Sequence, residues 1–417
     1  MKHLLTKHTS RKESKLLIAL RNGETTADSN IRGGFFRFTN QWWNGIITKI
    51  LCINKRCGLR YMDYSFYKDK RVLITGHTGF KGSWMTKLLL MQGASVSGYA
   101  LESEQDSALY SILKLDKEAD STIGDVRDID ELKRCFDRVK PEIVIHMAAQ
   151  PIVRESYKNP VYTYETNVMG TVNLLECVRL SDSVRSAVNV TTDKVYLNRE
   201  WEWGYRENEQ LDGYDPYSNS KSCSELVTGS YIRSFLKEKG VAVSTMRAGN
   251  VIGGGDYASD RIVPDCVRAA CKGEDIVVRN PYSVRPYQHV LEPVTAYLMV
   301  AMKQYEDHAY AGSYNIGPDE DGAVSTGEIV DMFTSDWSKL SGKKINWINR
   351  NEGGPHEAGY LRLDCSLLKK TFAWKPVWDI EKAVAKTVEW YYGFANGSNM
   401  NTLTEQQIKE FMTSVSF

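Results

Sequence analysis

Two short segments of this sequence carry side chains whose types and spacing suit proton transfer. The first is Tyr217-Ser218-Asn219-Ser220-Lys221, in which a phenol and an ammonium are four residues apart. Residues i and i+4 of a helix share one face, so Tyr217 and Lys221 point the same way. A nearby cation lowers the pKa of a phenol from about 10 toward neutrality, which makes Tyr217 a candidate proton acceptor. Taken alone, this spacing is also typical of a solvated helix face.

The second segment is Thr191-Thr192-Asp193-Lys194, which follows an apolar run. It places three hydrogen-bonding side chains in a row at the end of a predicted strand. The alternative is a polar strand end in which Asp193 serves as a turn residue.

A glycine-rich turn lies upstream of both segments. The apolar run 71–75 ends at Gly76, then Gly76-His77-Thr78-Gly79-Phe80-Lys81-Gly82 follows, and residues 83–92 are predicted to be helical. In this order, glycines permit a tight turn, close approach to a pyrophosphate and helix–strand packing. The free N–H groups at the helix N-terminus suit phosphates. We therefore predict dinucleotide binding here.

The remaining elements alternate between strand and helix. Further strands are predicted at 95–101, 121–124, 142–149, 187–196 and 241–251, with helices near 128–139, 160–180 and 216–238. This alternation predicts an α/β fold: a Rossmann-type doubly wound parallel sheet, with a smaller mixed α/β C-terminal lobe. Ligands bind at the carboxyl ends of such strands, so both candidate segments are expected at one edge of the sheet.

One feature of dinucleotide sites is missing. The predicted second strand ends at Leu101 without a ribose-binding acid, and the nearest acid is Glu102, so a preference for NAD over NADP is not indicated. Asp125 either faces the adenine or caps the helix that follows at Asp128, and the sequence leaves both open.

Charge is unevenly distributed along the chain. The formal net charge is +1, but residues 1–61 hold 12 Lys and Arg against three acids, a charge of +9. This segment is a basic targeting extension, a nucleic-acid-binding arm, or a leader without a role before a native start at Met62. We favour the last, because a complete domain begins shortly after Met62. We divide the chain into this basic extension (1–61), a dinucleotide-binding domain (62–253), a substrate lobe (254–395) and a peripheral tail (396–417).

Composition narrows the function classes. The near-zero net charge gives no argument for nucleic-acid binding. The eight cysteines form no C-x-x-C pair and no zinc spacing, so we expect reduced thiols, no metal and a cytoplasmic protein. No apolar run approaches about 20 residues, so no membrane span is expected.

From about Lys68 to Gly393 the sequence resembles the extended short-chain dehydrogenases/reductases. Within them it is similar to the sugar-nucleotide 4,6-dehydratases, most strongly those that act on CDP-glucose. The pieces that carry this resemblance are the glycine turn, 146–150, 166–170, Thr192-Asp193-Lys194, Tyr217 with Lys221, 247–256, 284–290 and Glu357-Ala358. Related dTDP-glucose dehydratases carry Asp-Glu in place of Asp193-Lys194, and epimerases lack the Asp. Residues 1–61 have no counterpart in the resemblance.

The resemblance implies a reaction in which CDP-glucose becomes its 4-keto-6-deoxy derivative with NAD as cofactor. Tyr217 would take the 4-hydroxyl proton, and Thr192 would hydrogen-bond the 4-oxygen. Lys221 would lower the pKa of Tyr217 and bind the nicotinamide ribose. Asp193 and Lys194 would serve as acid and base when water leaves across C5 and C6.

The resemblance also implies the binding residues. Cofactor contacts are expected from Gly76, His77, Gly79, Phe80, Lys81, Gly82, Asp125, Val126, Ala148, Ala149, Gln150, Asn167, Tyr217 and Lys221. Substrate contacts are expected from Arg247, Asn250, Arg261, Arg285 and His289, since arginine forks suit phosphate oxygens. A homodimer joined through the helices near 160–180 and 216–238 is implied, as is deoxysugar biosynthesis for lipopolysaccharide O-antigen.

Two rivals remain. One is a dehydratase or 4-epimerase for another nucleotide sugar, and the other is a non-catalytic nucleotide sensor on the same fold. Tyr217→Phe separates enzyme from sensor: turnover is predicted to disappear while binding of nucleotide persists. A sensor would keep its binding behaviour in this variant and would have no turnover to lose.

Overall fold

The computed structural model describes residues 64–103, 108–319, 323–350 and 360–414. The chain divides into two compact units, Met1–Leu59 and Arg60–Phe417, and every described residue lies in the second. The predicted basic extension, the proposed start at Met62 and the Glu357-Ala358 piece all lie outside the described residues.

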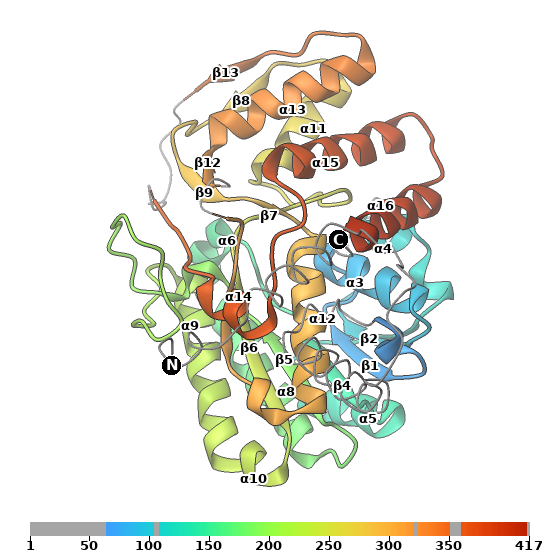
Figure 1. Ribbon diagram of the computed structural model, residues 1–417, viewed down its shortest axis with the longest axis vertical. Helices are drawn as coiled ribbons and strands as arrows, with labels where there is room; N and C mark the ends of the chain where they lie inside the picture. Colours follow the sequence, from blue (N-terminus) through green and yellow to red (C-terminus); the bar gives the residue numbers. More distant parts are fainter. Residues whose placement is uncertain (1–63, 104–107, 320–322, 351–359, 415–417) are drawn as a thin grey trace, which may run out of the picture. The chain divides into compact units, whose positions relative to one another are not determined.

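A seven-stranded sheet forms the centre of the second unit, in the order β11-β6-β5-β4-β1-β2-β3 (Figure 1). All six pairings between these strands are parallel, which confirms the predicted doubly wound parallel sheet. The strands are β1 (Arg71–Thr75), β2 (Ser95–Ala100), β3 (Asp120–Ile123), β4 (Ile143–His146), β5 (Ser186–Val190), β6 (Ala242–Ala248) and β11 (Ser313–Ile316).

Helices cover both faces of the sheet because its strands are apolar on both sides. Val72 and Ile74 of β1 join a core with α3 (Phe80–Met91) and α12 (Leu291–Glu306). Leu73, between them, joins a second core with α5 (Ile129–Val139), α8 (Gly170–Leu180) and α9 (Pro216–Tyr231). Strand side chains alternate between faces, so consecutive residues of one strand enter different cores.

The chain beyond residue 253 contributes to two regions. It supplies β11 to the central sheet and α12 to the helices that cover one face of that sheet. It also builds a smaller mixed group of elements, which Figure 1 shows at the end of the unit opposite α10 (Lys237–Lys239). These are α11 (Ile262–Lys272), β8 (Ile276–Val278), α13 (Thr326–Ser341), β13 (Trp347–Asn349) and α15 (Ile380–Ala395). The substrate role of residues 254–395 stays a prediction, and residues 291–316 belong with the sheet.

Short elements complete the described chain. Paired strands are β7 (Val251–Ile252) with β10 (Gln288–His289), and β9 (Val284–Pro286) with β12 (Ala323–Ser325). The other helices and turns are η1 (Tyr64–Tyr67), α4 (Leu109–Ile112), η2 (Leu115–Lys117), α6 (Val153–Lys158), α7 (Pro160–Tyr164), η3 (Glu165–Met169), η4 (Asp193–Val195), η5 (Ile232–Leu236), η6 (His308–Tyr310) and α14 (Ser366–Phe372).

The last segment packs more closely than its polar composition predicted. Residues Met400–Ser414 form α16, which buries Ile408 and Phe411 completely. The Trp390 indole of α15 donates to the Thr404 hydroxyl at 3.0 Å. An apolar residue every three or four positions is enough to seat a helix, even where most of its residues are polar.

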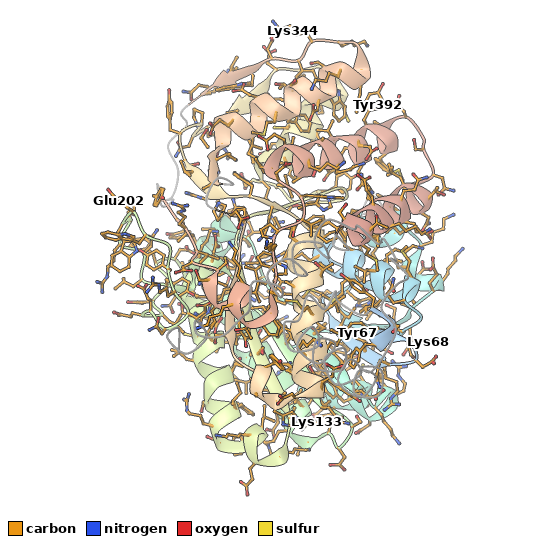
Figure 2. All side chains as sticks on the ribbon, in the orientation of Figure 1. Tyr67, Lys68, Lys133, Glu202, Lys344 and Tyr392 are labelled. Carbon is orange, nitrogen blue, oxygen red and sulfur yellow. The ribbon has the colours of Figure 1, made fainter. Side chains whose placement is uncertain are left out.

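A long-range hydrogen bond links η1, the first described element, to α12. Tyr67, labelled in Figure 2, donates its hydroxyl to the Leu298 carbonyl of α12 at 2.6 Å.

Among the described residues, no helix is both long and apolar enough to cross a membrane.

Candidate active site

A cleft of about 1730 Å³ runs along the carboxyl edge of the sheet. One wall comes from the segments that follow β1 to β6, and the opposite wall includes residues 277–280, Arg285 and Tyr287. The volume exceeds the ~300–1,000 Å³ usual for one small-molecule ligand, so the cleft has room for two.

Two glycines of the turn are required by close packing. Gly76 has φ +77°, and a Cβ there would lie 2.8 Å from the Ala148 backbone nitrogen. A Cβ on Gly82 would lie 2.2 Å from the Gly76 carbonyl oxygen. The turn therefore stays tight enough for α3 to begin at the cleft, with Gly79 at its N-cap. Free N–H groups at this helix start face the cleft and suit a diphosphate.

Phe80 and Lys81 of the turn also line the cleft. Burial, together with the positive charges of Arg261 and Lys221, lowers the pKa of Lys81 to about 7, and the Asp193 charge opposes this effect. Several cations thus face one another in a confined space, which is an environment that attracts an anionic ligand.

His77 and Asn167, which were predicted to contact the cofactor, do not line the cleft. The His77 ring is fully buried, its Nε2 is 2.7 Å from the Ser121 hydroxyl, and burial lowers its pKa to about 4. Asn167 is 1% exposed and bonds the backbone of Gln150, accepting from its N–H at 2.8 Å and donating to its carbonyl at 3.0 Å. Both residues hold the loops that form the site.

The remaining predicted cofactor residues lie at the cleft. Val126, Ala148, Ala149 and Gln150 line it, as does Asp125. The Asp125 carboxylate accepts from the Arg127 backbone and side chain. Asp128 itself caps α5 by accepting from two backbone N–H groups. Asp125 therefore does not cap that helix, which removes one of its two alternatives.

Helix α9 brings Tyr217 and Lys221 to the cleft, as their spacing predicted. Asp215 caps the helix and Pro216 begins it, so Tyr217 stands in its first turn. The Lys221 ammonium donates to the Val190 carbonyl at 3.2 Å. Val190 ends β5, so this bond ties the helix to the carboxyl edge of the sheet.

The expected lowering of the Tyr217 pKa does not occur in the protein alone. Burial raises the pKa of Tyr217 to about 12, the bond with the Thr192 hydroxyl opposes this rise, and the Asp193 charge adds to it. Burial likewise lowers the pKa of Lys221 to about 8. A buried phenol needs a compensating positive charge nearby to ionise near neutrality, and the spacing of the two residues alone does not supply it.

Thr192, Asp193 and Lys194 lie together at the cleft, beside Tyr217. Asp193 is completely buried, and its Oδ1 accepts from the Thr192 hydroxyl at 3.0 Å and from the Lys194 ammonium at 2.9 Å. Its Oδ2 is buried without a hydrogen-bond partner. An unpaired buried carboxylate oxygen at a cleft is an acceptor left for a ligand. Lys194 also reaches the Asn250 amide oxygen at 3.4 Å.

Arg247 does not line the cleft, and its guanidinium is bonded inside the protein, so its position does not favour the predicted phosphate contact. It is 2% exposed, and Nε and Nη2 each donate to Glu225 at 2.9 Å. Its Nη1 donates to the Tyr196 hydroxyl and the Glu207 carbonyl. Burial disfavours its charge, but the bonds to Glu225 outweigh burial and raise the pKa of Arg247. Strand alternation turns residue 247 toward α9 rather than along the edge of the sheet.

Of the other predicted substrate residues, three line the cleft and one does not. Asn250, Arg261 and Arg285 line the cleft, and the Arg261 guanidinium pairs with Asp256 at 2.8 Å. His289 does not line it: the ring is fully buried between Trp84 and Trp378, at 5.7 and 4.8 Å between ring centroids. Burial lowers the pKa of His289 to about 3, so its ring is neutral and structural.

Sequence reasoning missed two cleft arginines. Asp260 Oδ1 lies 3.0 Å from Arg279 Nη1 and 3.4 Å from Arg154 Nη1, and all three residues line the cleft. Two cations thus share one carboxylate. Arg154 follows the fourth strand, which was a usable signal. Arg279 follows β8, a three-residue strand too short to be recognised.

Together these groups form a site for paired anionic ligands and proton transfer. The glycine turn and α3 suit one diphosphate, and the cleft arginines suit another. Tyr217, Asp193 and Lys194 supply acid and base groups between them. Among the residues that the structure describes, no cluster of His, Cys, Asp or Glu is arranged to hold a metal ion.

Comparison with known proteins gives the site its context. The family model for GDP-mannose 4,6 dehydratase matches residues 73–387. A CDP-glucose 4,6-dehydratase from Salmonella typhimurium is 45% identical over 359 residues, which cover 85% of this chain and 99% of the relative. A dTDP-glucose 4,6-dehydratase from Xanthomonas campestris is 26% identical, over 76% of this chain and 92% of the relative.

Solved structures share the fold. The UDP-glucose 4-epimerase of Thermus thermophilus, in complex with NAD, is 25% identical with a TM-score of 0.67. The match covers 78% of this chain and 99% of that chain. A dTDP-glucose 4,6-dehydratase from Bacillus anthracis, also in complex with NAD, is 22% identical with a TM-score of 0.64, over 78% of this chain and 96% of that chain.

The buried position of Arg247 generates a stability prediction. Arg247→Gln is expected to lower the free energy of unfolding by about 3–5 kcal/mol, because Glu225 is left buried without its cation. Urea unfolding measures this loss. Arg138→Gln, which removes the partner of Asp120 in an exposed pair between α5 and β3, is the control and should unfold like the wild type. An Arg247→Gln protein of unchanged stability that binds nucleotide sugars more weakly would restore the phosphate role.

Proposed function

This chain belongs to the GDP-mannose 4,6-dehydratase family, and we propose that it converts CDP-D-glucose to CDP-4-dehydro-6-deoxy-D-glucose and water with NAD as cofactor. The observation that carries the proposal is the Thr192-Asp193-Lys194 cluster beside Tyr217 in the cleft, in which Thr192 and Asp193 are buried. The 45% identity to a CDP-glucose 4,6-dehydratase supports the choice of nucleotide sugar.

The glycine turn fits the diphosphate of NAD. Side chains at Gly76 or Gly82 would collide with backbone, so the turn leaves the start of α3 open to phosphate oxygens. Tyr217, Lys221, Asp125 and Val126 all line the cleft. Tyr217 and Lys221 would meet the nicotinamide ribose, and Asp125 and Val126 would meet the adenine end. When bound, NAD accepts the hydride of C4 and returns it to C6, so the reaction needs no external oxidant.

The first proton transfer falls to Tyr217. Its phenolate removes the proton of the 4-hydroxyl, while the Thr192 hydroxyl holds the 4-oxygen. The high pKa of Tyr217 in the protein alone must fall for this step. Lys221 is already in place in the protein alone, so the further fall would come from the positive ring of the bound cofactor, and proton transfer would be favoured only once the site is loaded.

Asp193 and Lys194 then complete the elimination. The 4-ketone acidifies C5–H, a base removes that proton, and an acid gives a proton to the departing 6-hydroxyl. The two side chains are joined at 2.9 Å, so transfer of one proton from the ammonium to the carboxylate creates a neutral amine and a carboxylic acid together. The unpartnered Oδ2 is the oxygen available to O6.

The diphosphate of the sugar nucleotide is assigned to the cleft arginines other than Arg247. Arg261 and Arg285 line the cleft from the substrate side, and Arg154 and Arg279 face each other across Asp260. Their guanidinium forks suit bidentate contacts with phosphate oxygens.

We further propose a cytoplasmic homodimer. The described helices near 160–180 and 216–238 carry exposed apolar side chains: Val161 is 70% exposed, Leu226 58% and Phe235 46%. Apolar side chains gathered on neighbouring helices are typical of a protein interface. Sedimentation equilibrium should give twice the mass of the chain, and a monomer at micromolar concentration would contradict the dimer.

The experiment that tests the function is a panel of CDP-, dTDP-, UDP- and GDP-hexoses on purified protein, with and without added NAD. We expect the 4-keto-6-deoxy product from CDP-glucose alone. Asp193→Asn should bind NAD as the wild type does and lower turnover by a factor of 10² or more, as expected of a general acid (roughly 10²–10⁴).

Other outcomes of the panel would contradict the proposal. Turnover of another nucleotide sugar would be consistent with the mechanism but would contradict CDP-glucose as the substrate. Epimerisation at C4 without loss of water would point to the 4-epimerase alternative. No turnover of any sugar, with NAD still bound, would favour a non-catalytic nucleotide sensor.

A further inference from the structure

Arg247 and Glu225 form a buried ion pair, with 2.9 Å between Nη2 and Oε2, and Glu225 is on the same helix as the cleft residue Lys221. Lys221 and Glu225 are four residues apart on α9 and are 4% and 5% exposed. The Glu225 carboxylate accepts four hydrogen bonds: from the Thr191 hydroxyl at 2.5 Å, from the Thr245 hydroxyl at 2.6 Å, and from Arg247 Nε and Nη2, each at 2.9 Å. These partners come from the end of β5 and from β6, so the carboxylate is fixed on three sides.

Stability alone is a weak reason for such a pair. Removing two charges from water costs several kcal/mol, and replacing a buried pair by apolar residues is often neutral or stabilising. The position of the Glu225–Arg247 pair indicates a role in the active site instead, because it lies next to site residues. Lys221 lies one helical turn before Glu225, and Thr191 immediately precedes Thr192.

We propose that Glu225, held by Arg247, is a positioning residue that keeps the Lys221 ammonium charged and directed at the bound cofactor. The inference rests on the proposed function only in taking NAD as the ligand that Lys221 meets. Neither Glu225 nor Arg247 lines the cleft, so the pair acts through Lys221 and through the Thr191-Thr192 backbone rather than on the ligand.

The electrostatic surroundings agree with this role. Burial lowers the pKa of Lys221 to about 8, and Glu225 opposes the fall. The other ionisable groups that face this region are Lys81 on α3, His146 on β4, and Asp193 and Lys194 on η4. Burial lowers the pKa of His146 to about 3, so it adds no charge near neutral pH. Glu225 is the anion that acts on Lys221 from its own helix.

The charge of Lys221 sets how NAD binding is expected to change with pH. Lys221 is charged below about pH 8 and loses its charge above it. Removing the Glu225 charge lowers this limit further, so contacts that need the ammonium are lost at lower pH. The wild type should bind NAD about tenfold more weakly at pH 9 than at pH 7.

The test measures NAD affinity of the full chain by calorimetry from pH 6.5 to 9.5, in Glu225→Gln and in the double variant E225Q/R247Q. The double variant removes both charges, so it avoids an unpaired buried Arg247. Both are expected to lose affinity about one pH unit earlier than the wild type. Glu306→Gln, which removes the exposed carboxylate of a pair with Lys303 on α12, is the matched control and should follow the wild-type curve.

A double variant that folds and gives the wild-type pH curve would overturn the proposal and leave the pair a purely structural feature. If neither variant folds, Glu225→Asp decides: its shorter side chain cannot hold all four bonds, so a smaller shift in the same direction is expected and an unchanged curve overturns the idea. The readout is independent of substrate. Failure of the CDP-glucose panel with the predicted pH shift intact would reject the substrate and keep this inference.

Discussion

The parallel pairing of the seven central strands is the constraint on which the rest of the structure depends. Parallel strands end at one edge, so the segments after β1, β4, β5 and β6 all meet there although they are far apart in sequence. The glycine turn, the Asp193 cluster and Asn250 therefore share one cleft. Their arrangement needs no long-range recognition beyond correct strand order, and α9 adds Tyr217 and Lys221 by packing on the face beside β5 and β6.

A second consequence of this architecture is that charged groups are forced into buried positions. Both faces of the sheet are covered, so polar side chains near the edge must find partners inside the protein. Glu225 and Arg247 pair with each other through two hydrogen bonds. Two threonine hydroxyls complete Glu225, and the Tyr196 hydroxyl and a backbone carbonyl complete Arg247. Asp193 is satisfied on one oxygen only, and burial leaves Tyr217 with a raised pKa. Asp193 and Tyr217 both line the cleft, where a ligand can complete them.

The sequence predicted the elements that are periodic and the motifs that depend on local spacing. The parallel sheet, the glycine turn and the common face of Tyr217 and Lys221 are of this kind. The sequence could not predict which way side chains at the edge of the sheet point. Arg247 and His289 lie in segments that resemble known sites, yet tertiary packing turns both into the core. Arg279 depends on a three-residue strand, which carries too little periodicity to recognise. The depth to which Tyr217 is buried, and so its raised pKa, likewise arises only from the assembled fold.

The central claim is that one cleft oxidises C4, eliminates water across C5 and C6, and reduces C6 without an outside reductant. The most direct measurement uses CDP-glucose carrying deuterium at C4, with NAD bound to the protein, and locates the label in the product by NMR. The account predicts deuterium at C6 of the same molecule and a solvent proton at C5. Deuterium retained at C4, or lost to solvent with unlabelled C6, would contradict it.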